Sequence, residues 1–200
     1  MLVKIASKLT LILHRNNIIS EDETEIYQYG LEMILSTILN CMIVLLLGAL
    51  MNEPLAAVIF FIIFALVRSS SGGYHADTYL KCNSIFAVNL IMVLLWVKFA
   101  APFYFIVCHV IFILIYFMMV TKYAPIENPN KTLSDLQKKH NKVLSIIYGI
   151  ILTAISLILW YGFDLKKYAM LIAATMLSIT ISMAIVILRK EDKTYEEYNS

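Results

Sequence analysis

The sequence contains 200 residues, of which 60% are hydrophobic and only 15% are charged, and its formal net charge at pH 7 is +2. A soluble globular domain is nearer half apolar and a quarter charged, so this composition, with a mean hydropathy of +0.79, indicates a chain dissolved in lipid. The positive charge is too small and too scattered to indicate a nucleic-acid partner. We expect residues 1–200 to form a single integral membrane domain.

The N-terminal segment, residues 1–19, is amphipathic. Its apolar side chains recur at roughly helical spacing over residues 2–15, and Lys4, Lys8 and Arg15 occupy other positions. This pattern predicts a helix lying on the membrane surface, with an ordinary packed helix as the alternative. Ser20, followed by Glu23, then matches a capping box and predicts the start of the next helix.

Six hydrophobic segments follow, and six transmembrane helices in an all-α membrane protein are the best interpretation. Four segments have about the 20 residues that a membrane-spanning helix needs, namely 31–50, 103–120, 143–162 and 168–188. The other two, 55–67 and 84–97, are short enough to be either spans or re-entrant segments. The polar stretch between them could therefore dip into the membrane. Residues 189–200 are expected to be a solvated, frayed tail.

The positions of lysine and arginine predict the orientation of these spans. With the N-terminus inside, thirteen of the 16 basic residues fall on the inner side, and the outer side keeps only Lys98, Lys166 and Lys167. Short cytoplasmic loops carry an excess of Lys and Arg. Both termini and the polar stretch at 68–82 are therefore predicted to face the cytoplasm, where a cysteine stays reduced.

The polar stretch RSSSGGYHADTYLKC, residues 68–82, contains the one His and Cys of the sequence that share a polar segment, His75 and Cys82. A thiol becomes a useful nucleophile when a neighbouring imidazole removes its proton. Gly72 and Gly73 permit backbone conformations that other residues avoid, and could let a substrate strand approach closely. A cysteine–histidine catalytic dyad is therefore one hypothesis for this stretch.

Geometry limits that hypothesis. In one straight helix, His75 and Cys82 would be separated by a rise of about 10.5 Å, which is too far for proton transfer. A dyad requires His75 in a bend and Cys82 near the start of the next helix, with Asp77, Asn83 or Ser84 as orienting residues. The alternatives are a polar loop of a channel or transporter and, less favoured, a two-ligand metal site. No metal or cofactor is predicted.

Other polar residues within the spans are interpreted as structural. His109 is expected to face the helix bundle, and Asn40 and Asn89 to make interhelical hydrogen bonds. Cys41 and Cys108 lie in apolar runs, where cysteine usually behaves as a small apolar side chain.

The polar stretch resembles the accessory gene regulator B (AgrB) family of quorum-sensing membrane peptidases. The matching features are an Arg, a Gly-Gly pair, an aromatic residue, His-Ala and a Cys seven residues after the His, which here are Arg68, Gly72, Gly73, Tyr74, His75, Ala76 and Cys82. The later stretch KYAPIENPNK is similar to a second signature of that family, an Ala-Pro followed by a polar run containing Lys, here Ala124, Pro125 and Lys131. The resemblance extends over essentially the whole chain.

The resemblance implies a cysteine endopeptidase that removes the C-terminal tail of an AgrD-like precursor peptide through an acyl-thioester. It assigns Cys82 as the nucleophile and His75 as the general base and acid, with Arg68, Gly72 and Gly73 as supporting residues. A side chain of the peptide would then close a thiolactone or lactone ring. The family also implies a bacterial cell membrane, a homodimer and no cofactor.

The segment 122–142 is basic, and Lys131, Lys138 and Lys139 are candidates for binding the acidic tail of such a precursor. The alternative is that these lysines only set the membrane orientation. Two other classes of function stay open at this stage: a transporter or exporter of a small peptide without chemistry, and an interaction protein that binds a partner without cutting it.

Overall fold

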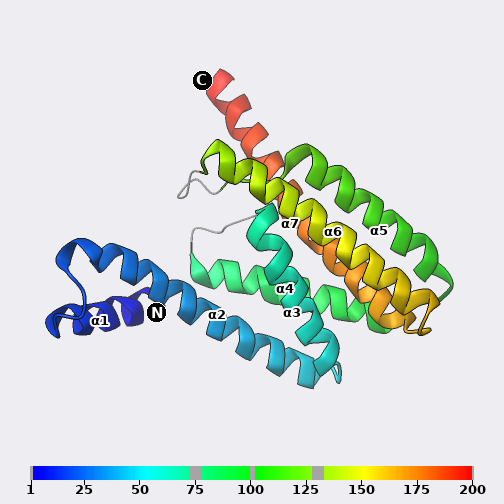
Figure 1. Ribbon diagram of the computed structural model, residues 1–200, viewed down its shortest axis with the longest axis horizontal. Coiled ribbons are helices and arrows are strands. Elements are labelled where there is room, and N and C mark those ends of the chain that lie inside the picture. The colour runs from blue at the N-terminus through cyan, green and yellow to red at the C-terminus, as the bar shows by residue number, and fades with distance from the viewer. Residues whose placement is uncertain (1, 73–77, 100–101, 128–132, 200) are drawn as a thin grey trace.

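The computed structural model describes residues 2–72, 78–99, 102–127 and 133–199, and these ranges are almost entirely helical (Figure 1). A short 3-10 helix, Glu21–Glu23, leads into the second of seven α-helices. The α-helices are α1 Leu2–Arg15, α2 Thr24–Leu50, α3 Pro54–Ser71, α4 Tyr79–Phe99, α5 Pro102–Tyr123, α6 Asp135–Tyr161 and α7 Lys166–Asn199. Within the described ranges the only β-type pairing is one isolated bridge, between Gly72 and Ile126.

Six of these helices, α2 to α7, are long and apolar enough to cross a membrane, which confirms the predicted number of spans. The two segments that looked short are full-length helices of 18 and 21 residues, α3 and α4. They are longer than predicted because α3 continues through Arg68 to Ser71 and α4 already begins at Tyr79. A helix satisfies its own backbone hydrogen bonds whatever the polarity of its side chains, so polar residues can extend it.

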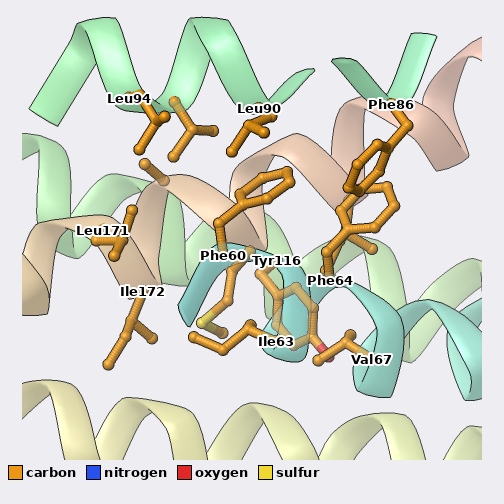
Figure 2. Close-up of a cluster of buried hydrophobic side chains, with 14 of the residues drawn as sticks. Phe60, Ile63, Phe64, Val67, Phe86, Leu90, Leu94, Tyr116, Leu171 and Ile172 are labelled. Atoms are coloured by element: carbon orange, nitrogen blue, oxygen red, sulfur yellow. The ribbon is translucent and has the colours of Figure 1, made fainter. Parts of the chain in front are cut away.

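The core of the bundle forms where α3 and α4 pack against α7 (Figure 2). The Phe60, Phe64 and Phe86 rings pack against one another, with ring centroids 5.3 Å apart for Phe60–Phe64 and 5.5 Å for Phe64–Phe86. On α7, buried residues continue around the helix from Ala169 to Met176, so this helix is enclosed by its neighbours. A helix that is apolar all round is expected in that central position.

The C-terminal residues depart from the prediction. The expected frayed tail at 189–200 is instead a continuation of α7 as far as Asn199, and it projects from the bundle in Figure 1. Lys, Arg and Glu are good helix formers, so the charged sequence can continue the helix. With 34 residues, α7 is about 50 Å long and exceeds the thickness of a bilayer core.

The N-terminal helix α1 packs against α2, with Ala6 and Thr10 buried between them. Val3 and Ile12 are exposed beside its lysines, so its placement on the membrane surface stays a prediction. The predicted capping box between the two helices is confirmed, since the Ser20 N–H donates to Glu23 Oε2 at 2.9 Å.

Hydrogen bonds between spans confirm two of the structural predictions. Asn89 Oδ1 accepts from Ser178 Oγ of α7 at 2.8 Å. His109 is buried, bonds to Ser156 of α6 and stacks on the Trp160 ring at 5.3 Å between centroids. Asn40 differs, because its Oδ1 is buried and has no hydrogen-bond partner among the described residues.

Candidate active site

A cleft of about 520 Å³ lies between α2, α3, α4 and the segment that follows α5. It contains three of the residues singled out from the sequence, Arg68, Gly72 and Cys82. Its other described lining residues are Tyr29, Met33, Ser36, Thr37, Asn40, Phe61, Phe64, Ala65, Ser69, Ser70, Tyr79, Phe86, Pro125, Ile126, Glu127, Leu133 and Asn141. The wall thus combines an apolar part, formed by Phe61, Phe64, Ala65 and Phe86 of α3 and α4, with polar side chains along α2 and at the end of α3.

Cys82 lies in the first turn of α4, as the dyad hypothesis requires. Its backbone N–H donates to Thr78 O at 3.0 Å, and the Lys81 N–H lies 3.3 Å from Thr78 Oγ1. Thr78 therefore caps the helix, and threonine suits this position because its hydroxyl can accept a free N–H. The Cys82 side chain is half-buried and free of any disulfide, so it can react with a molecule in the cleft.

Arg68 reaches Cys82 from the last turn of α3. Its guanidinium lies beside the Cys82 side chain, close enough for the two groups to interact electrostatically. It also lies over the Phe64 ring, 5.3 Å from the ring centroid, which holds the cation against an aromatic face. Two residues that are 14 positions apart in the sequence therefore form one unit, a thiol with a cation beside it.

Gly72 joins the two stretches on which the family resemblance rests. The Ile126 N–H donates to Ser71 O at 2.9 Å, and Gly72 forms the isolated parallel bridge with Ile126. Gly72 has φ +73°, and a Cβ at this position would lie 2.1 Å from Ile126 O. Only glycine fits this conformation and this approach. The Ala124–Pro125 peptide just before Ile126 is cis.

A network of buried hydroxyl groups lies behind the cleft. Ser145 Oγ of α6 lies 2.9 Å from Ser70 Oγ of α3 and 2.9 Å from Asn141 O. The Tyr116 hydroxyl of α5 donates to Ser145 O at 2.8 Å. Buried polar groups are stable when they are paired, so this network fixes the end of α3, and with it Arg68, against α5 and α6.

Sequence reasoning missed a polar pair on the α2 side of the cleft. The Tyr79 hydroxyl lies beside the Glu32 carboxylate, which accepts from Gln28 Nε2 at 3.1 Å. The signal was available, because an ionisable residue such as Glu32 inside a predicted span is uncommon and usually functional.

Asn83 and Ser84 were proposed as orienting residues for His75. Asn83 is buried and faces α2, where its Oδ1 accepts from Ser36 Oγ at 3.0 Å. Its Nδ2 is buried and has no partner among the described residues. Ser84 is exposed. His75, Gly73 and Asp77 lie outside the described residues, so the dyad itself stays a prediction.

Among the predicted lysines, Lys138 lies beside the rim of the cleft. Its Nζ is 3.1 Å from Glu127 Oε1 and 3.9 Å from Asp135 Oδ1. Lys139 is exposed on the first turns of α6 and lines a separate shallow hollow with His140. Lys131 lies outside the described residues. Within the part of the chain that the structure describes, no three His, Cys, Asp or Glu side chains gather as a metal site.

Comparison with known proteins gives a consistent result. The family model described as Accessory gene regulator B matches residues 6–187. AgrB-like protein 2 of Clostridium perfringens (strain 13 / Type A) is 31% identical over 181 residues, covering 84% of this chain and 81% of the relative. An AgrB-like protein of Clostridium perfringens (strain SM101 / Type A) is 29% identical over 192 residues, covering 90% and 85%. No solved structure matches the chain significantly.

Proposed function

Because the chain belongs to the Accessory gene regulator B family, we propose that it is a membrane-embedded cysteine endopeptidase acting on an AgrD-like precursor peptide. It removes the C-terminal tail of the precursor and allows the remainder to cyclise into an autoinducing peptide for quorum sensing. The observation that carries this proposal is the position of Cys82, which is half-buried in a cleft at the start of α4 with Arg68 against its side chain.

The first chemical step is attack by the Cys82 sulfur on the scissile carbonyl carbon. A C–S bond forms, and the C–N bond then breaks, so that the tail leaves as a free amine and the peptide stays on the enzyme as a thioester. His75 takes the thiol proton and delivers it to the departing nitrogen. The cleft supports this step because it brings the sulfur to a space of about 520 Å³ that can enclose part of a peptide.

The second step closes the ring. A Cys or Ser side chain of the bound peptide attacks the thioester carbonyl and gives up its proton to His75, which passes it to the departing Cys82 sulfur. The new thioester or ester bond forms as the bond to Cys82 breaks. Thioester exchange is nearly balanced in energy, so this chemistry requires no ATP. Enclosure of the acyl-enzyme helps, because water would otherwise hydrolyse the thioester.

The cleft lies on the cytoplasmic side in this proposal, where a newly made precursor arrives. The arrangement of charges supports this orientation. Lys98 and Lys167, two of the three basic residues assigned to the outer side, both contact the α2–α3 turn, whereas Arg68 and Cys82 lie at the other ends of α3 and α4. Family membership also suggests that the enzyme works as a homodimer.

Tail release is the direct test. The chain, reconstituted with a precursor encoded alongside it, is followed by mass spectrometry together with Cys82→Ala, His75→Ala and a Cys41→Ala/Cys108→Ala control. We expect the wild type and the control to release the tail, both site variants to lose activity by at least about 10³-fold, and the wild type to carry an acyl adduct on Cys82.

Two results would contradict the proposal. Continued cleavage by Cys82→Ala would mean that another enzyme in the preparation cuts the precursor. Export of uncut peptide that survives Cys82→Ser would favour a transporter, because Ser has nearly the shape of Cys and is a far poorer nucleophile.

A further inference from the structure

We propose that Arg68 is the oxyanion donor of this site. Its guanidinium donates a hydrogen bond to the negatively charged oxygen that forms when the Cys82 sulfur adds to a carbonyl. This inference rests on the proposed peptidase function and deepens it by assigning a role in the transition state to one residue. It starts from a requirement of acyl transfer, that a donor must lie where the negative charge develops.

Backbone donors next to the sulfur are already committed. In many acyl-transfer enzymes the N–H of the nucleophilic residue itself serves as an oxyanion donor. Here the Cys82 N–H donates to Thr78 O at 3.0 Å, and the N–H of the preceding residue, Lys81, donates to Thr78 Oγ1 at 3.3 Å. Neither of these two N–H groups is therefore available to an oxyanion without losing its present bond.

Most hydroxyl groups on the cleft wall are committed as well. Each carries a single O–H donor. Four of the six described hydroxyl side chains that line the cleft donate elsewhere: Ser36 to Asn83 Oδ1, Thr37 to Met33 O, Ser69 to Leu66 O and Ser70 to Val67 O. Of the other two, Tyr79 lies beside the Glu32 carboxylate, and Tyr29 lines the cleft from α2 and is 54% exposed. Each of the first four could serve the oxyanion only by giving up its bond.

Side-chain amides are less well placed than Arg68. Asn83 follows Cys82 in the sequence, but its Nδ2 is enclosed by protein and the residue is absent from the described cleft lining. Asn40 and Asn141 line the cleft from the opposing helices α2 and α6. Arg68 instead lies directly beside the Cys82 side chain.

The shape of the guanidinium suits the two atoms that it must serve. The sulfur and the oxyanion of a tetrahedral intermediate are bonded to the same carbon, and a guanidinium presents five N–H donors in a planar fork. A group that contacts the sulfur can therefore also contact the oxygen beside it. The Phe64 ring holds the fork in place at 5.3 Å, and the apolar wall strengthens a charge-assisted hydrogen bond.

The step is balanced without transfer of a proton from Arg68. As the C–S bond forms, the π electrons of the carbonyl move to its oxygen, which Arg68 stabilises by a hydrogen bond while it stays protonated. When the intermediate collapses, the carbonyl bond forms again, the C–N bond breaks, and the amine departs with the proton supplied by His75. Arg68 returns to its contact with the sulfur.

The test compares reactions that do and do not form an oxyanion, in a Cys41→Ala/Cys108→Ala background where Cys82 is the only thiol. Arg68→Gln and Arg68→Lys are assayed for tail release and for alkylation by iodoacetamide. They are also assayed for inhibition by a peptide aldehyde that has the sequence of the precursor on the N-terminal side of the cleaved bond. The aldehyde forms a tetrahedral adduct with an oxyanion, whereas alkylation attacks a saturated carbon. Lys81→Gln is the matched control, because it removes an exposed cation next to Cys82 in the sequence.

For Arg68→Gln we expect kcat for tail release to fall by about 10²- to 10³-fold and the affinity for the aldehyde to fall by a similar factor, with KM nearly unchanged. Alkylation should stay within about threefold of the control. For Arg68→Lys, kcat and the affinity for the aldehyde should lie between those of Arg68→Gln and the background protein, because lysine keeps the positive charge but lacks the planar fork of donors. Lys81→Gln should behave as the background protein.

Equal losses in alkylation and tail release would overturn the inference, since Arg68 would then act on the sulfur or on the fold. Unchanged tail release in Arg68→Gln would overturn it too. If the background protein neither releases a tail nor binds the aldehyde, the proposed function itself fails and this inference with it, which is a different result from either of the first two.

Discussion

At the end of the bundle where α2 turns into α3, charged side chains are paired within the fold. Lys167 Nζ lies 2.6 Å from each carboxylate oxygen of Glu53, and Lys98 Nζ donates to Met51 O at 2.9 Å. At the opposite end of α3, Arg68 lies against a thiol and an aromatic ring on the wall of a cleft. We call these the closed end and the cleft end. At the closed end, the charged side chains hold neighbouring helices together. At the cleft end, the charged side chain of Arg68 lies next to the thiol that is proposed to react.

The comparison predicts that substitutions at the two ends have separable effects. At the cleft end, changes should reduce catalysis more than stability, because the groups there line an open space that a substrate can enter. At the closed end the reverse should hold. If a substitution at either end reduced catalysis and stability equally, the proposed difference between the two ends would be wrong.

Among the substitutions that compare the two ends, Gly72→Val at the cleft end is expected to have the largest effect. A Cβ there would meet Ile126 O at 2.1 Å, and φ is +73°, so the bridge between the α3 terminus and the segment after α5 must open. We expect tail release to fall by at least about 100-fold, because misplacing catalytic groups by about 1 Å has that effect. The thermal midpoint in detergent should fall much less, since the spans themselves are unchanged.

Gly30→Val is the matched control for this prediction. Gly30 lies in α2, and nothing would come within 4 Å of an added Cβ. Its tail release should stay within about twofold of wild type. Equal activities for the two glycine variants would show that the bridge to Ile126 does not support the site.

An intermediate effect, on stability alone, is expected for Lys167→Met at the closed end. It leaves Glu53, whose side chain is 14% exposed, without its partner. We expect a loss of roughly 1–3 kcal/mol in the free energy of unfolding, less than for a fully buried pair because Lys167 is 41% exposed. Chemical denaturation in micelles measures this loss, and kcat for tail release should be unchanged.

Asp164→Asn provides the control at the same end. It breaks the ion pair between Asp164, whose side chain is 82% exposed, and Lys166, whose side chain is 49% exposed. Because exposed ion pairs contribute little, its effect on stability should be below about 1 kcal/mol. If Lys167→Met lowers kcat as strongly as stability, the two ends are coupled and the proposed division of roles is wrong.

Much of this fold can be predicted from the sequence, because membrane-spanning helices are recognisable by their length and apolar composition. It also marks Cys82, since a thiol in a polar stretch next to a predicted helix start is chemically unusual. The ends of α3 and α4 were missed because Arg68 to Ser71 are polar and Tyr79 to Cys82 contain only one strongly apolar residue, Leu80. Low hydropathy over these residues predicts a loop, although both stretches are helical.

Long-range pairings could not be predicted in the same way. The bridge from Gly72 to Ile126 and the contact between Tyr79 and Glu32 each join segments more than 40 residues apart, and no local pattern specifies the partner. The sequence showed only that Gly72 can adopt a positive φ and that Glu32 is out of place in a span. The identity of each partner depends on how the helices pack.

The smallest predicted effect concerns the basic residues near the rim of the cleft. If Lys138 and Lys139 attract an acidic precursor tail, Lys138→Glu and Lys139→Glu should each raise KM for tail release by about three- to tenfold at low salt, with kcat unchanged. The effect should fade above about 0.3 M salt, because exposed charges are screened over a few ångströms there. Lys138→Glu should have the larger effect, since it also places a negative charge 3.1 Å from Glu127.

Lys166→Glu is the matched control, because it makes the same change of charge on an exposed lysine at the closed end. It should leave KM unaltered at every salt concentration, since it lies at the far end of the bundle from the cleft. If the three variants behave alike, the lysines serve only to orient the chain in the membrane. If only the two on α6 respond, and only at low salt, the cleft end attracts its substrate by charge as well as reacting with it.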